Sequence, residues 1–502
     1  MNENKEFETI LDKFRDVVSV QKNKIAVEFY DESITYGELD YKSSNIAYTL
    51  KKLGIEKNEV VGVMMNRSIE LIVAIIGILK AGAVYLPLDI IYPEERINYI
   101  LKDSKCKVLL TNTDINEGIN FFGNVVDIRS LSEDQDQVLI QHEQNIEETT
   151  AYILYTSGST GEPKGVPISH KALFAFYEGI NKKIPFKSGD RILAVTTVSF
   201  DISILELLIP LGLGMTVVLA DSKTGKNPRL LMNYISKKNI NVIQMTPTRM
   251  TILLDSMKSK DWLDNVKMFL IGGESFPISL LEKLKNVIKS DAQIYNLYGP
   301  TESTIWVSVA ELTNESQIHI GTPLAGSNLI ILDENLKPVE IEKYGEICII
   351  GKQLSNGYIN KAELTKKRFI NIDEFPGEVI YRTGDYGCEL MNGMFLCKGR
   401  IDDQVKIRGY RVELNEVTQT LLGVSGVRNA AVVALDGKND TKFLCAFYES
   451  DSKLDTNIIR DYMKKYLPYY MVPEKFEWTN QLPETLNQKI DKKVLMNMKK
   501  DM

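Results

Sequence analysis

The sequence predicts an α/β protein with a large N-terminal domain of mixed and largely parallel sheets, a β-rich subdomain, and a small C-terminal α+β domain. Three observations support this fold class. The chain has 502 residues, which exceeds the length that one hydrophobic core usually supports. Apolar strand-like runs alternate with helical stretches between Val60 and Ile288. Beyond that point the pattern changes to closely spaced strands.

Short runs rich in Val, Ile and Leu predict the buried strands of the N-terminal domain. These runs are Val60–Met65, Val108–Thr111, Ile192–Thr197, Thr216–Ala220, Val242–Met245 and Met268–Ile271. Helical patterns lie between several of them, at Glu70–Lys80, Pro228–Lys238 and Ile278–Ile288. Strands that alternate with helices are typical of α/β proteins with largely parallel sheets.

The later part of the chain predicts two further units. Strands separated by turn residues over Leu329–Gly351 indicate an antiparallel β-region. After it, strands at Val427–Leu435 and Phe443–Tyr448 and a helix at Asn457–Tyr466 form an α+β pattern. A unit of about 100 residues has the size of a domain. We therefore expect an N-terminal domain over residues 1–400 and a C-terminal domain over residues 401–502.

The composition is that of an ordinary soluble globular protein. Hydrophobic residues make up 44% and charged residues 25% of the chain, which argues against disorder. The formal net charge of −7 gives no global electrostatic reason to bind nucleic acid or an anionic membrane. The most hydrophobic segment, Ile69–Leu79, contains Glu70 and is shorter than a membrane span of about 20 residues. It predicts a buried helix.

The N-terminus shows no apolar stretch typical of a secretory signal. The five cysteines and three histidines match no disulfide framework or zinc motif. Free thiols in a reducing compartment explain the cysteines best. We therefore expect a cytoplasmic protein with no nucleic-acid partner and no membrane partner.

The strongest local signal is Tyr155–Gly165, which reads YTSGSTGEPKG and follows the apolar Ala151–Leu154. Its glycines let the backbone turn tightly and approach a ligand. Its hydroxyls and exposed amides suit phosphate oxygens, and Lys164 adds a positive charge. It is not a Walker A loop, because Pro163 breaks that spacing. The composition alone leaves phosphate binding and a plain surface loop equally open.

Two further segments carry residue types suited to nucleotide chemistry. In Asn296–Glu302, Tyr298 could stack on a flat base and Glu302 could hold a hard cation such as magnesium. A turn at the end of a strand explains the same segment equally simply. In Tyr381–Asp385, an acidic residue at a turn could accept both ribose hydroxyls, although such short triplets are common.

Two charged segments follow nearer the C-terminus. Gly399–Glu413 reads GRIDDQVKIRGYRVE, and such charge density is typical of a solvated face. Leu482–Leu495 carries Lys489 beside Asn487 in a predicted turn. A single surface lysine is usually solvated rather than catalytic.

Together and in this order, the five segments resemble the adenylate-forming superfamily, and more closely the adenylation domains of nonribosomal peptide synthetases. The resemblance covers nearly the whole chain. Other segments that match the family's motifs are Ile34–Leu39, Leu79–Pro87, Phe200–Ser203, Tyr344–Ile347 and Leu467–Pro473. The resemblance implies a ligase that uses ATP and Mg²⁺ to activate a carboxylate as an acyl-adenylate, with release of pyrophosphate.

The resemblance also implies a role for each matching residue. The loop over the phosphates would comprise Thr156, Ser157, Gly158, Ser159, Thr160, Gly161 and Lys164; the remaining nucleotide contacts would come from Asn296 and Tyr298 at the adenine, with Gly299 beside them, Thr301 at an α-phosphate oxygen, and Asp385 and Arg400 at the ribose. Glu302 would hold the magnesium. Lys489 would bridge the substrate carboxylate and the α-phosphate, so that Lys489, Thr301 and Glu302 form the catalytic set. Asp402 would be the hinge between the domains, with Lys406 beside it.

The chemistry agrees with these roles. An attack of a carboxylate on the α-phosphorus brings two anions together, so positioning and cations should carry catalysis without a protein nucleophile. Removal of a preorganised charge such as Lys489 should cost on the order of 10²–10³ in rate. The motif around Lys489 departs from the family pattern P-N-G-K, because Leu486 and Gln488 replace the Pro and the Gly. Pro167 is also unusual for the family.

Asp201 decides the class of substrate. In synthetase adenylation domains the matching Asp holds the α-ammonium group of an amino acid, whereas acyl-activating and aryl-activating relatives have no amine to bind. A partly buried carboxylate without a cation would be costly, which favours an amino acid. A helix N-cap is the plainer interpretation of Asp201.

The remaining specificity positions predict the size of the substrate. They fall on Ile202, Leu205, Gln244, Leu270, Gly272, Leu297, Ile305 and Trp306. With Asp201 and Lys489 they resemble the pattern associated with glycine, because Trp306 and the branched side chains would fill the space that a substrate side chain needs. Walls that clash with a methyl group can reject alanine. The plainer interpretation is ordinary core packing.

The resemblance implies a second step, in which the aminoacyl group passes to the phosphopantetheine thiol of a carrier protein. The sequence shows no carrier-type serine motif after Val494, so we expect a separate carrier protein, although an excised domain of a larger synthetase would look the same. Rotation at Asp402 would replace Lys489 with the Gly409–Arg411 face for this step. The alternatives to glycine activation are a ligase for D-alanine or L-alanine and a carrier protein, an acyl-CoA ligase, and an inactive nucleotide-binding homologue.

Overall fold

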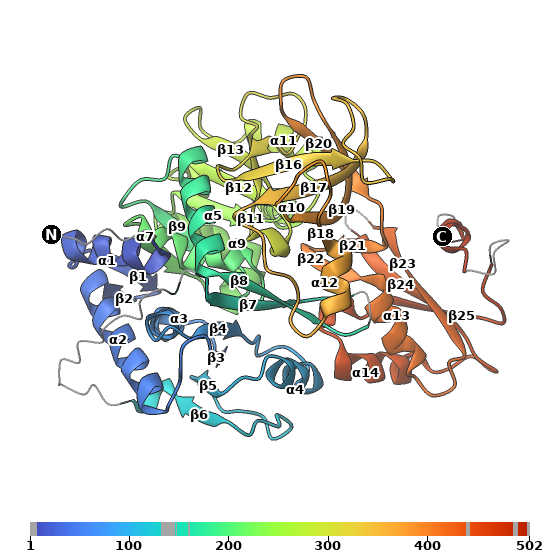
Figure 1. The fold of residues 1–502 in the computed structure, drawn as a ribbon, viewed down its shortest axis with the longest axis horizontal. Helices are drawn as coiled ribbons and strands as arrows, with labels where there is room; N and C mark the ends of the chain where they lie inside the picture. Colours follow the sequence, from blue (N-terminus) through green and yellow to red (C-terminus); the bar gives the residue numbers. More distant parts are fainter. Residues whose placement is uncertain are drawn as a thin grey trace.

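The structure is a computed structural model and describes residues 8–131, 146, 148–158, 161–437, 442–484 and 490–498. In Figure 1 the N-terminal part, from blue to yellow, lies on the left and centre, and the C-terminal part, in orange and red, lies on the right. The predicted fold class is confirmed: the N-terminal part contains two mixed sheets with helices and a β-rich subdomain, and a smaller α+β unit follows.

One sheet is built from six described strands in the order β6-β5-β3-β4-β7-β8. All neighbours in it are parallel except β7 and β8, which pair antiparallel. The strands are β3 (Val60–Met64), β4 (Val84–Pro87), β5 (Val108–Thr111), β6 (Asn124–Asp127), β7 (Thr150–Thr156) and β8 (Lys164–Ser169).

A second sheet contains nine described strands in the order β15-β14-β13-β12-β11-β9-β10-β1-β2. Its inner strands are parallel, and antiparallel strands close both edges. The strands are β1 (Ile25–Phe29), β2 (Glu32–Thr35), β9 (Arg191–Ala194), β10 (Thr216–Leu219), β11 (Val242–Met245), β12 (Met268–Gly272), β13 (Gln293–Tyr298), β14 (Ser308–Glu311) and β15 (Thr322–Pro323).

Two of the predicted elements are shorter in the structure. The predicted strand Ile192–Thr197 ends at Ala194, because the amides of Val195 and Thr196 donate to the Glu206 carboxylate instead of a neighbouring strand. The predicted helix Ile278–Ile288 ends at Lys285. The other strands and helices named from the sequence are present within one or two residues of their predicted ends.

Helices cover these sheets and lie between them. They are α1 (Ile10–Gln21), α2 (Tyr36–Lys52), α3 (Ile69–Lys80), α4 (Glu94–Asp103), α5 (His170–Lys183), α6 (Ile202–Leu207), α7 (Ile209–Gly212), α8 (Ser222–Lys226), α9 (Pro228–Lys237), α10 (Pro247–Ser256), α11 (Ile278–Lys285) and α12 (Ala362–Arg368). Hydroxyl and carboxylate caps begin several of them. At α2, for example, Thr35 and Glu38 form a reciprocal capping box.

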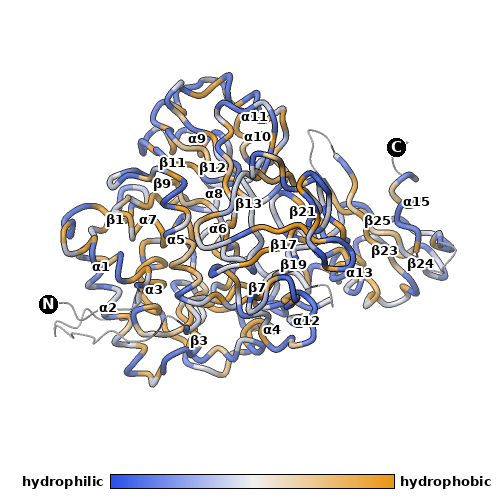
Figure 2. The backbone as a smooth tube through the Cα atoms, turned by 45° about the horizontal axis from the view of Figure 1, so that its top comes forward, coloured by the Kyte–Doolittle hydropathy of each residue, from blue (hydrophilic) through white to orange (hydrophobic). Residues whose placement is uncertain are grey.

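Helix α3 lies between the two large sheets and is the predicted buried helix. Its residues from Leu71 to Lys80 are buried, it contacts strands of both sheets, and it falls in a hydrophobic part of the tube in Figure 2. A helix that is apolar on every side belongs in the interior. The buried Lys80 is accommodated because its ammonium group donates to the Asp40 carboxylate and backbone carbonyl, at 2.7 Å each. No helix in the described part of the chain is long and apolar enough to cross a bilayer.

The β-rich subdomain is an antiparallel sheet, as predicted for Leu329–Gly351. Its strands are β16 (Ser327–Leu332), β17 (Gly345–Gly351), β18 (Phe369–Ile370), β19 (Ile380–Glu389) and β20 (Phe395–Arg400). The chain then enters the C-terminal unit. This unit contains β21 (Gln404–Ile407), β22 (Tyr410–Glu413), β23 (Asn429–Asp436), β24 (Lys442–Glu449), β25 (Lys475–Thr479), α13 (Leu414–Leu422), α14 (Thr456–Tyr466) and α15 (Lys492–Asn497).

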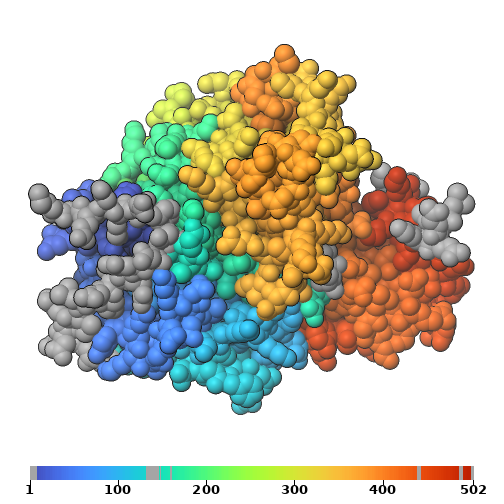
Figure 3. All heavy atoms as spheres, viewed as in Figure 1, coloured from blue at the N-terminus to red at the C-terminus, as the bar shows by residue number. Residues whose placement is uncertain are grey.

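The C-terminal unit is docked on the N-terminal part. One apolar cluster combines side chains of α4 and β7 with side chains of β22, α13 and α14. In the space-filling view of Figure 3, the orange and red surface lies directly against the blue and gold surfaces. The boundary between residues 400 and 401 remains a prediction.

We predict that Gly77→Ala destabilises the protein. A Cβ at this position would lie 2.5 Å from the Cβ of Ile46 and 2.8 Å from the carbonyl oxygen of Ser43, so α2 and α3 would have to separate. Overpacking of this kind costs about 1–3 kcal/mol, and urea unfolding should show a lower midpoint. The matched control is Gly37→Ala in α2, where the nearest atom to the added Cβ would lie at 3.2 Å. Equal midpoints for the two variants would contradict this packing.

Candidate active site

The predicted site residues gather at the carboxyl ends of the parallel strands of the nine-stranded sheet. Strands β9, β11, β12 and β13 are neighbours and run in the same direction, so the segments that follow them meet at one edge. In parallel α/β sheets, ligands bind outside this edge. Asp201, Gly273 and Tyr298, which follow or end three of these strands, line one cavity.

This cavity is narrow, about 80 Å³, and its walls come from both domains. Of the nine residues predicted to contact the substrate, Asp201, Ile202 and Trp306 line it. Leu297 lines the adjoining cleft, and Leu205, Gln244, Leu270, Gly272 and Ile305 are buried and line neither space. Of the nine positions, three therefore form this cavity's wall directly.

Asp201 begins helix α6, and its carboxylate accepts a hydrogen bond of 2.8 Å from the amide of Ile202. Enclosure of the carboxylate raises its pKa to about 6, while hydrogen bonds from the Thr301 side chain and the Ile202 amide favour the charged form. The nearby charge of Glu302 raises the pKa further, and Lys406 lowers it. An enclosed carboxylate with an incompletely neutralised charge is suited to a cationic ligand.

Trp306 lines the same cavity as this carboxylate. It is 2% exposed, and its indole nitrogen donates to the side-chain oxygen of Gln244 at 3.1 Å. Gly272 leaves room for the ring, because a Cβ there would lie 2.7 Å from Cη2 of Trp306 and 2.6 Å from the carbonyl oxygen of Leu297. The arrangement leaves little volume for a ligand side chain.

A larger cleft of about 680 Å³ adjoins the cavity and contains the residues predicted to bind adenine and ribose. Asn296 donates its side-chain amide to the carbonyl oxygen of His319 at 2.8 Å, which leaves its own oxygen as an acceptor for a base. Tyr298 donates to one oxygen of Asp385 at 2.7 Å, and Arg400 donates to the other at 2.9 Å. Gly299 also lines this cleft.

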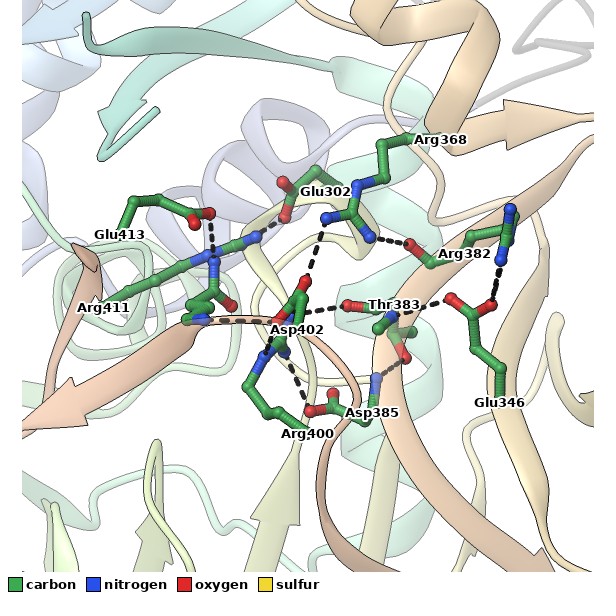
Figure 4. A network of polar contacts seen from close by, with 12 residues as sticks. Glu302, Glu346, Arg368, Arg382, Thr383, Asp385, Arg400, Asp402, Arg411 and Glu413 are labelled. Atoms are coloured by element: carbon green, nitrogen blue, oxygen red, sulfur yellow. Dashed lines mark hydrogen bonds and ion pairs between the residues drawn. The ribbon is translucent and has the colours of Figure 1, made fainter. Parts of the chain in front are cut away.

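Glu302 is the centre of a buried ion cluster, part of which is drawn in Figure 4. One carboxylate oxygen lies 3.2 Å from the Lys164 ammonium group and accepts a hydrogen bond of 2.7 Å from Tyr358. The other oxygen lies 2.7 Å from the guanidinium group of Arg411, which reaches across from β22. Burial alone would raise the pKa of Glu302, but Arg411 and Lys164 together hold it well below its usual value. Burial and the positive charge of Arg411 lower the pKa of Lys164 to about 8.

These contacts decide whether Glu302 fits a magnesium ion in the described domain arrangement. Both of its oxygens already bind protein donors, its side chain has no exposed area, and a guanidinium group occupies the side that faces the other domain. Groups of three or more His, Cys, Asp or Glu that could hold a metal do not occur among the described residues. The residues do not fit a metal while Arg411 is in place.

The predicted phosphate loop contacts the C-terminal unit. Ser157 donates to the carbonyl oxygen of Arg411 at 2.9 Å and accepts from the amide of Glu413 at 3.2 Å. The amide of Gly158 donates to Glu416 at 2.9 Å, and the same carboxylate pairs with Arg96 of α4 at 2.8 Å. The docked domain thus engages an amide and a hydroxyl of the loop that the resemblance assigns to phosphate binding.

Other predicted loop residues fall in different places. The hydroxyl of Thr156 has no hydrogen-bond partner within the described part of the chain. Gly161 has a φ of +91° and lies beside Gln419 of α13. Ser159 and Thr160 lie outside the described residues.

The predicted hinge residue Asp402 accepts hydrogen bonds from two arginines. Arg400 contacts both of its oxygens, at 2.7 and 2.9 Å, and Arg368 contacts one at 3.0 Å, as Figure 4 shows. Lys406 lines both cavities. Lys489 lies outside the described residues. The segments on either side of it meet at a bridge between Glu484 and Ile490.

The Gly409–Arg411 face lies against the N-terminal site. Gly409 has a φ of +87°, and a Cβ there would lie 2.6 Å from Cγ2 of Thr246. Tyr410 packs edge-on against Phe200 at 4.8 Å and stacks on Tyr470 at 3.8 Å. This is the face that the resemblance associates with the second step, and in the described arrangement it faces the N-terminal site.

The sequence analysis did not single out Arg96, Glu206, Tyr358 and Glu416. Glu206 carried a usable signal, because it is a charged residue within an otherwise apolar stretch, whereas Glu416 lies in a helix with several polar residues and carried none. Tyr358 and Arg96 carried none, since their roles depend on partners far away in the sequence.

Comparison with known proteins agrees with this geometry. A family model described as "AMP-binding enzyme" matches residues 14–359, and one described as "AMP-binding enzyme C-terminal domain" matches residues 416–489. The chain belongs to the AMP-binding enzyme family. The prediction of an ATP-dependent, AMP-forming ligase is thereby confirmed.

The relatives of this AMP-binding enzyme include nonribosomal peptide synthetases. Bacitracin synthase 1 of Bacillus licheniformis is 36% identical over 97% of this chain, which corresponds to 9% of that protein. Tyrocidine synthase 1 of Brevibacillus parabrevis is 32% identical over 96% of this chain and 44% of that protein. The chain therefore spans less than half the length of each of these two relatives.

Solved structures resemble the AMP-binding enzyme over nearly its whole length. A four-domain nonribosomal peptide synthetase bound to AMP and glycine is 34% identical, with a TM-score of 0.70 over 97% of this chain and 36% of that chain. The o-succinylbenzoate-CoA synthetase of Bacillus subtilis is 22% identical, with a TM-score of 0.86 over 97% and 98% of the two chains. The second likeness shows the fold alone.

We predict that Glu416→Ala loosens the C-terminal domain. The substitution would leave the buried Arg96 without this carboxylate, and removal of one partner of a buried ion pair costs about 3–5 kcal/mol. Energy transfer between fluorophores attached at Lys366 of α12 and at Ile458 of α14 should show a smaller population of the described arrangement.

The matched control for this measurement is Asp461→Asn, which removes a solvent-exposed ion pair with Lys464 on α14 and should leave the transfer efficiency unchanged. Equal efficiencies for the Glu416 and Asp461 variants would contradict the role of the buried pair.

Proposed function

We propose that this AMP-binding enzyme activates an amino acid, glycine, as aminoacyl-AMP and then transfers it to the phosphopantetheine thiol of a carrier protein. The observation that carries the proposal is that an enclosed carboxylate, Asp201, and a buried indole ring, Trp306, line the same narrow cavity. The carboxylate suits an ammonium group, and the wall excludes a side chain. The similar synthetase that was solved with AMP and glycine supports this choice.

The residues of the site support the first step by position and charge. An oxygen of the glycine carboxylate attacks the α-phosphorus of ATP, the bond from that phosphorus to the bridging oxygen breaks, and pyrophosphate leaves. Asp201 would hold the ammonium group so that the carboxylate points toward Thr301, which lines the same cavity. Lys164, and Lys489 by resemblance, would stabilise negative charge on the phosphoryl oxygens.

In this proposal a magnesium ion binds only when the C-terminal domain is in a different position from the one described. We propose that Glu302 holds the ion once Arg411 has moved away, because one carboxylate oxygen is then released from its cation. When bound, the ion would neutralise charge on the phosphates of the nucleotide.

The described arrangement supports the second step. Gly409 and Arg411 line the cavity from the C-terminal side, and Tyr410 between them packs against Phe200, which also lines it. Gly409 packs directly against Thr246, since an added Cβ would lie 2.6 Å from its Cγ2, so a phosphopantetheine arm would need a small displacement of these two residues to reach the cavity. The carrier protein that would bear this arm remains a proposal.

We predict that glycine gives the highest rate of ATP–pyrophosphate exchange among the amino acids, and that excess EDTA abolishes this exchange. Trp306→Ala should admit alanine and larger substrates, since a pocket gains about 1–3 kcal/mol for each methylene that it accommodates. Preferential exchange with D-alanine or L-alanine would replace glycine as the substrate. Exchange with acids that lack an amine would indicate an acyl ligase, and no exchange with any acid would contradict the proposal as a whole.

The charge of Asp201 generates a second prediction, on pH dependence. The carboxylate must be ionised to pair with an ammonium group, and its pKa in the free protein is raised to about 6. Acid therefore removes the binding form, and kcat/KM for the amino acid should fall about tenfold per pH unit below that value.

Two variants check this assignment. Asp201→Asn should raise KM for glycine about 30-fold or more at pH 7.5, since an unpaired buried charge costs 2 kcal/mol or more, and it should flatten the pH profile. Asp221→Asn, which keeps an N-cap on α8, should behave as the wild type does. A wild-type profile that is flat between pH 5 and 7 would contradict the pairing.

A further inference from the structure

A buried carboxylate lies directly behind the amino-acid cavity. Glu206 of α6 has no exposed area, and it is not one of the positions that the sequence assigned to the substrate. Its Oε2 accepts hydrogen bonds of 2.8 Å from the amides of Val195 and Thr196. Its Oε1 accepts from the hydroxyl of Thr196 at 2.5 Å and from the side-chain amide of Gln244 at 3.1 Å.

These four bonds all use Glu206 as an acceptor, so only the ionised carboxylate satisfies every donor around it. The charge is tolerated in the interior because the buried guanidinium groups of Arg67 and Arg249 interact with it electrostatically. Four donors and two distant cations fix the carboxylate in one position. The Glu206 carboxylate is therefore a fixed hydrogen-bond acceptor next to Gln244.

The Glu206 carboxylate fixes the orientation of the Gln244 side-chain amide. The NH₂ group of Gln244 donates to Glu206 and also to the carbonyl oxygen of Ile202, at 2.8 Å. Both neighbours are acceptors, so this end of the amide must be the nitrogen. The side-chain oxygen of Gln244 is therefore left to face the cavity wall.

That oxygen accepts the indole N–H of Trp306 at 3.1 Å. Gln244 is 1% exposed and Trp306 is 2% exposed, so neither group can replace this bond with one to solvent. The bond holds the indole ring against Gly272, in the space that a substrate side chain would occupy. A chain of hydrogen bonds thus runs from Glu206 through Gln244 to the residue that limits the cavity.

We propose that Glu206 is a positioning residue that sets the size limit of the amino-acid site through Gln244 and Trp306. This inference rests on the proposed function, since it explains how that site would distinguish glycine from alanine. Glu206 does not touch the cavity, and its effect on the substrate is indirect.

Replacement of Glu206 by glutamine can reverse the donor-to-acceptor direction of the hydrogen bonds that connect residue 206, Gln244 and Trp306. A glutamine side chain at position 206 would have to point its NH₂ group at hydrogen-bond donors. These donors are either the backbone amides of Val195 and Thr196 or the side chains of Thr196 and Gln244. If the new NH₂ group faces Gln244, the Gln244 amide must turn to offer its oxygen, and its own NH₂ group then meets the indole N–H of Trp306. Two donors cannot pair, so Trp306 loses its fixed position.

The experiment compares Glu206→Gln and Glu206→Asp with the wild type in two measurements. The first is the ratio of kcat/KM for glycine to kcat/KM for alanine in ATP–pyrophosphate exchange, which should fall about tenfold in both variants because a buried hydrogen bond is lost. The second is the ¹⁵N–¹H signal of the Trp306 indole, assigned among the three tryptophans by Trp306→Phe. This signal should shift and exchange faster with solvent.

Thr196→Val is the matched control. It removes another donor to the same carboxylate oxygen without touching Gln244 or Trp306, so it should leave the ratio and the indole signal unchanged. If this control moves both readouts as far as Glu206→Gln does, the effect is general destabilisation and the inference is overturned. An unchanged ratio and indole signal in folded Glu206→Gln would overturn it as well.

The two readouts separate this inference from the proposed function. Wild-type protein that does not activate glycine contradicts the proposed function, while a shifted indole signal in the variants still supports the chain from Glu206 to Trp306. If neither Glu206 variant folds, the inference is tested by the rate of hydrogen exchange at the indole N–H of Trp306 in the wild-type protein. Slow exchange supports the inference, and exchange as fast as that of a free indole overturns it.

Discussion

The Glu302 carboxylate has no contact with solvent and takes its counterions from both domains. Lys164 and Tyr358 belong to the N-terminal part, while Arg411 comes from β22 of the C-terminal unit. A buried charge with one partner removed is strongly destabilising. The docking of the C-terminal unit therefore has an electrostatic component as well as the apolar one between α4, α13 and α14. Arg411 also lines the same cavity as Asp201 and Asp385, so the docked C-terminal unit forms part of the wall of the candidate site.

The narrow cavity and the larger cleft lie next to each other at one edge of the nine-stranded sheet. Strands β11, β12 and β13 end side by side, and each supplies residues at or just beyond its end to one part or the other. This proximity is what an adenylating enzyme needs, because a carboxylate and an α-phosphate must meet within bonding distance. Trp306 lines both the narrow cavity and the larger cleft, which agrees with the proposal of a small amino acid beside a nucleotide.

The sequence predicted much of the fold because its apolar runs are short and regularly spaced, and the segments that carry the site sit at the ends of those runs. Asp201, Glu302 and Asp385 follow from motifs within single segments. The structure places Asp201 and Asp385 in the lining of one cavity, while Glu302 is buried next to Thr301, which lines that cavity. The pairing of Arg411 with Glu302 could not be predicted in this way, because it depends on how two domains dock.

Local backbone chemistry explains other differences between the sequence analysis and the structure. The strand predicted over Ile192–Thr197 is shorter because the Glu206 side chain captures two amides that a ladder would otherwise use. The periodicity of apolar residues does not reveal a side chain that competes with a neighbouring strand for backbone amides. The functions assigned to the individual site residues, and the hinge at Asp402, remain predictions.

The position of α3 between two sheets has a consequence for biosynthesis. One of its sheet partners, β1, precedes it in the chain, but β10 of the same sheet follows more than a hundred residues later. A helix with no polar face cannot bury itself until both layers exist. Because β1 pairs along the nine-stranded sheet with β10, the layer on that side of α3 is complete only after Leu219 has left the ribosome, and until then this side of the apolar helix is open to aggregation.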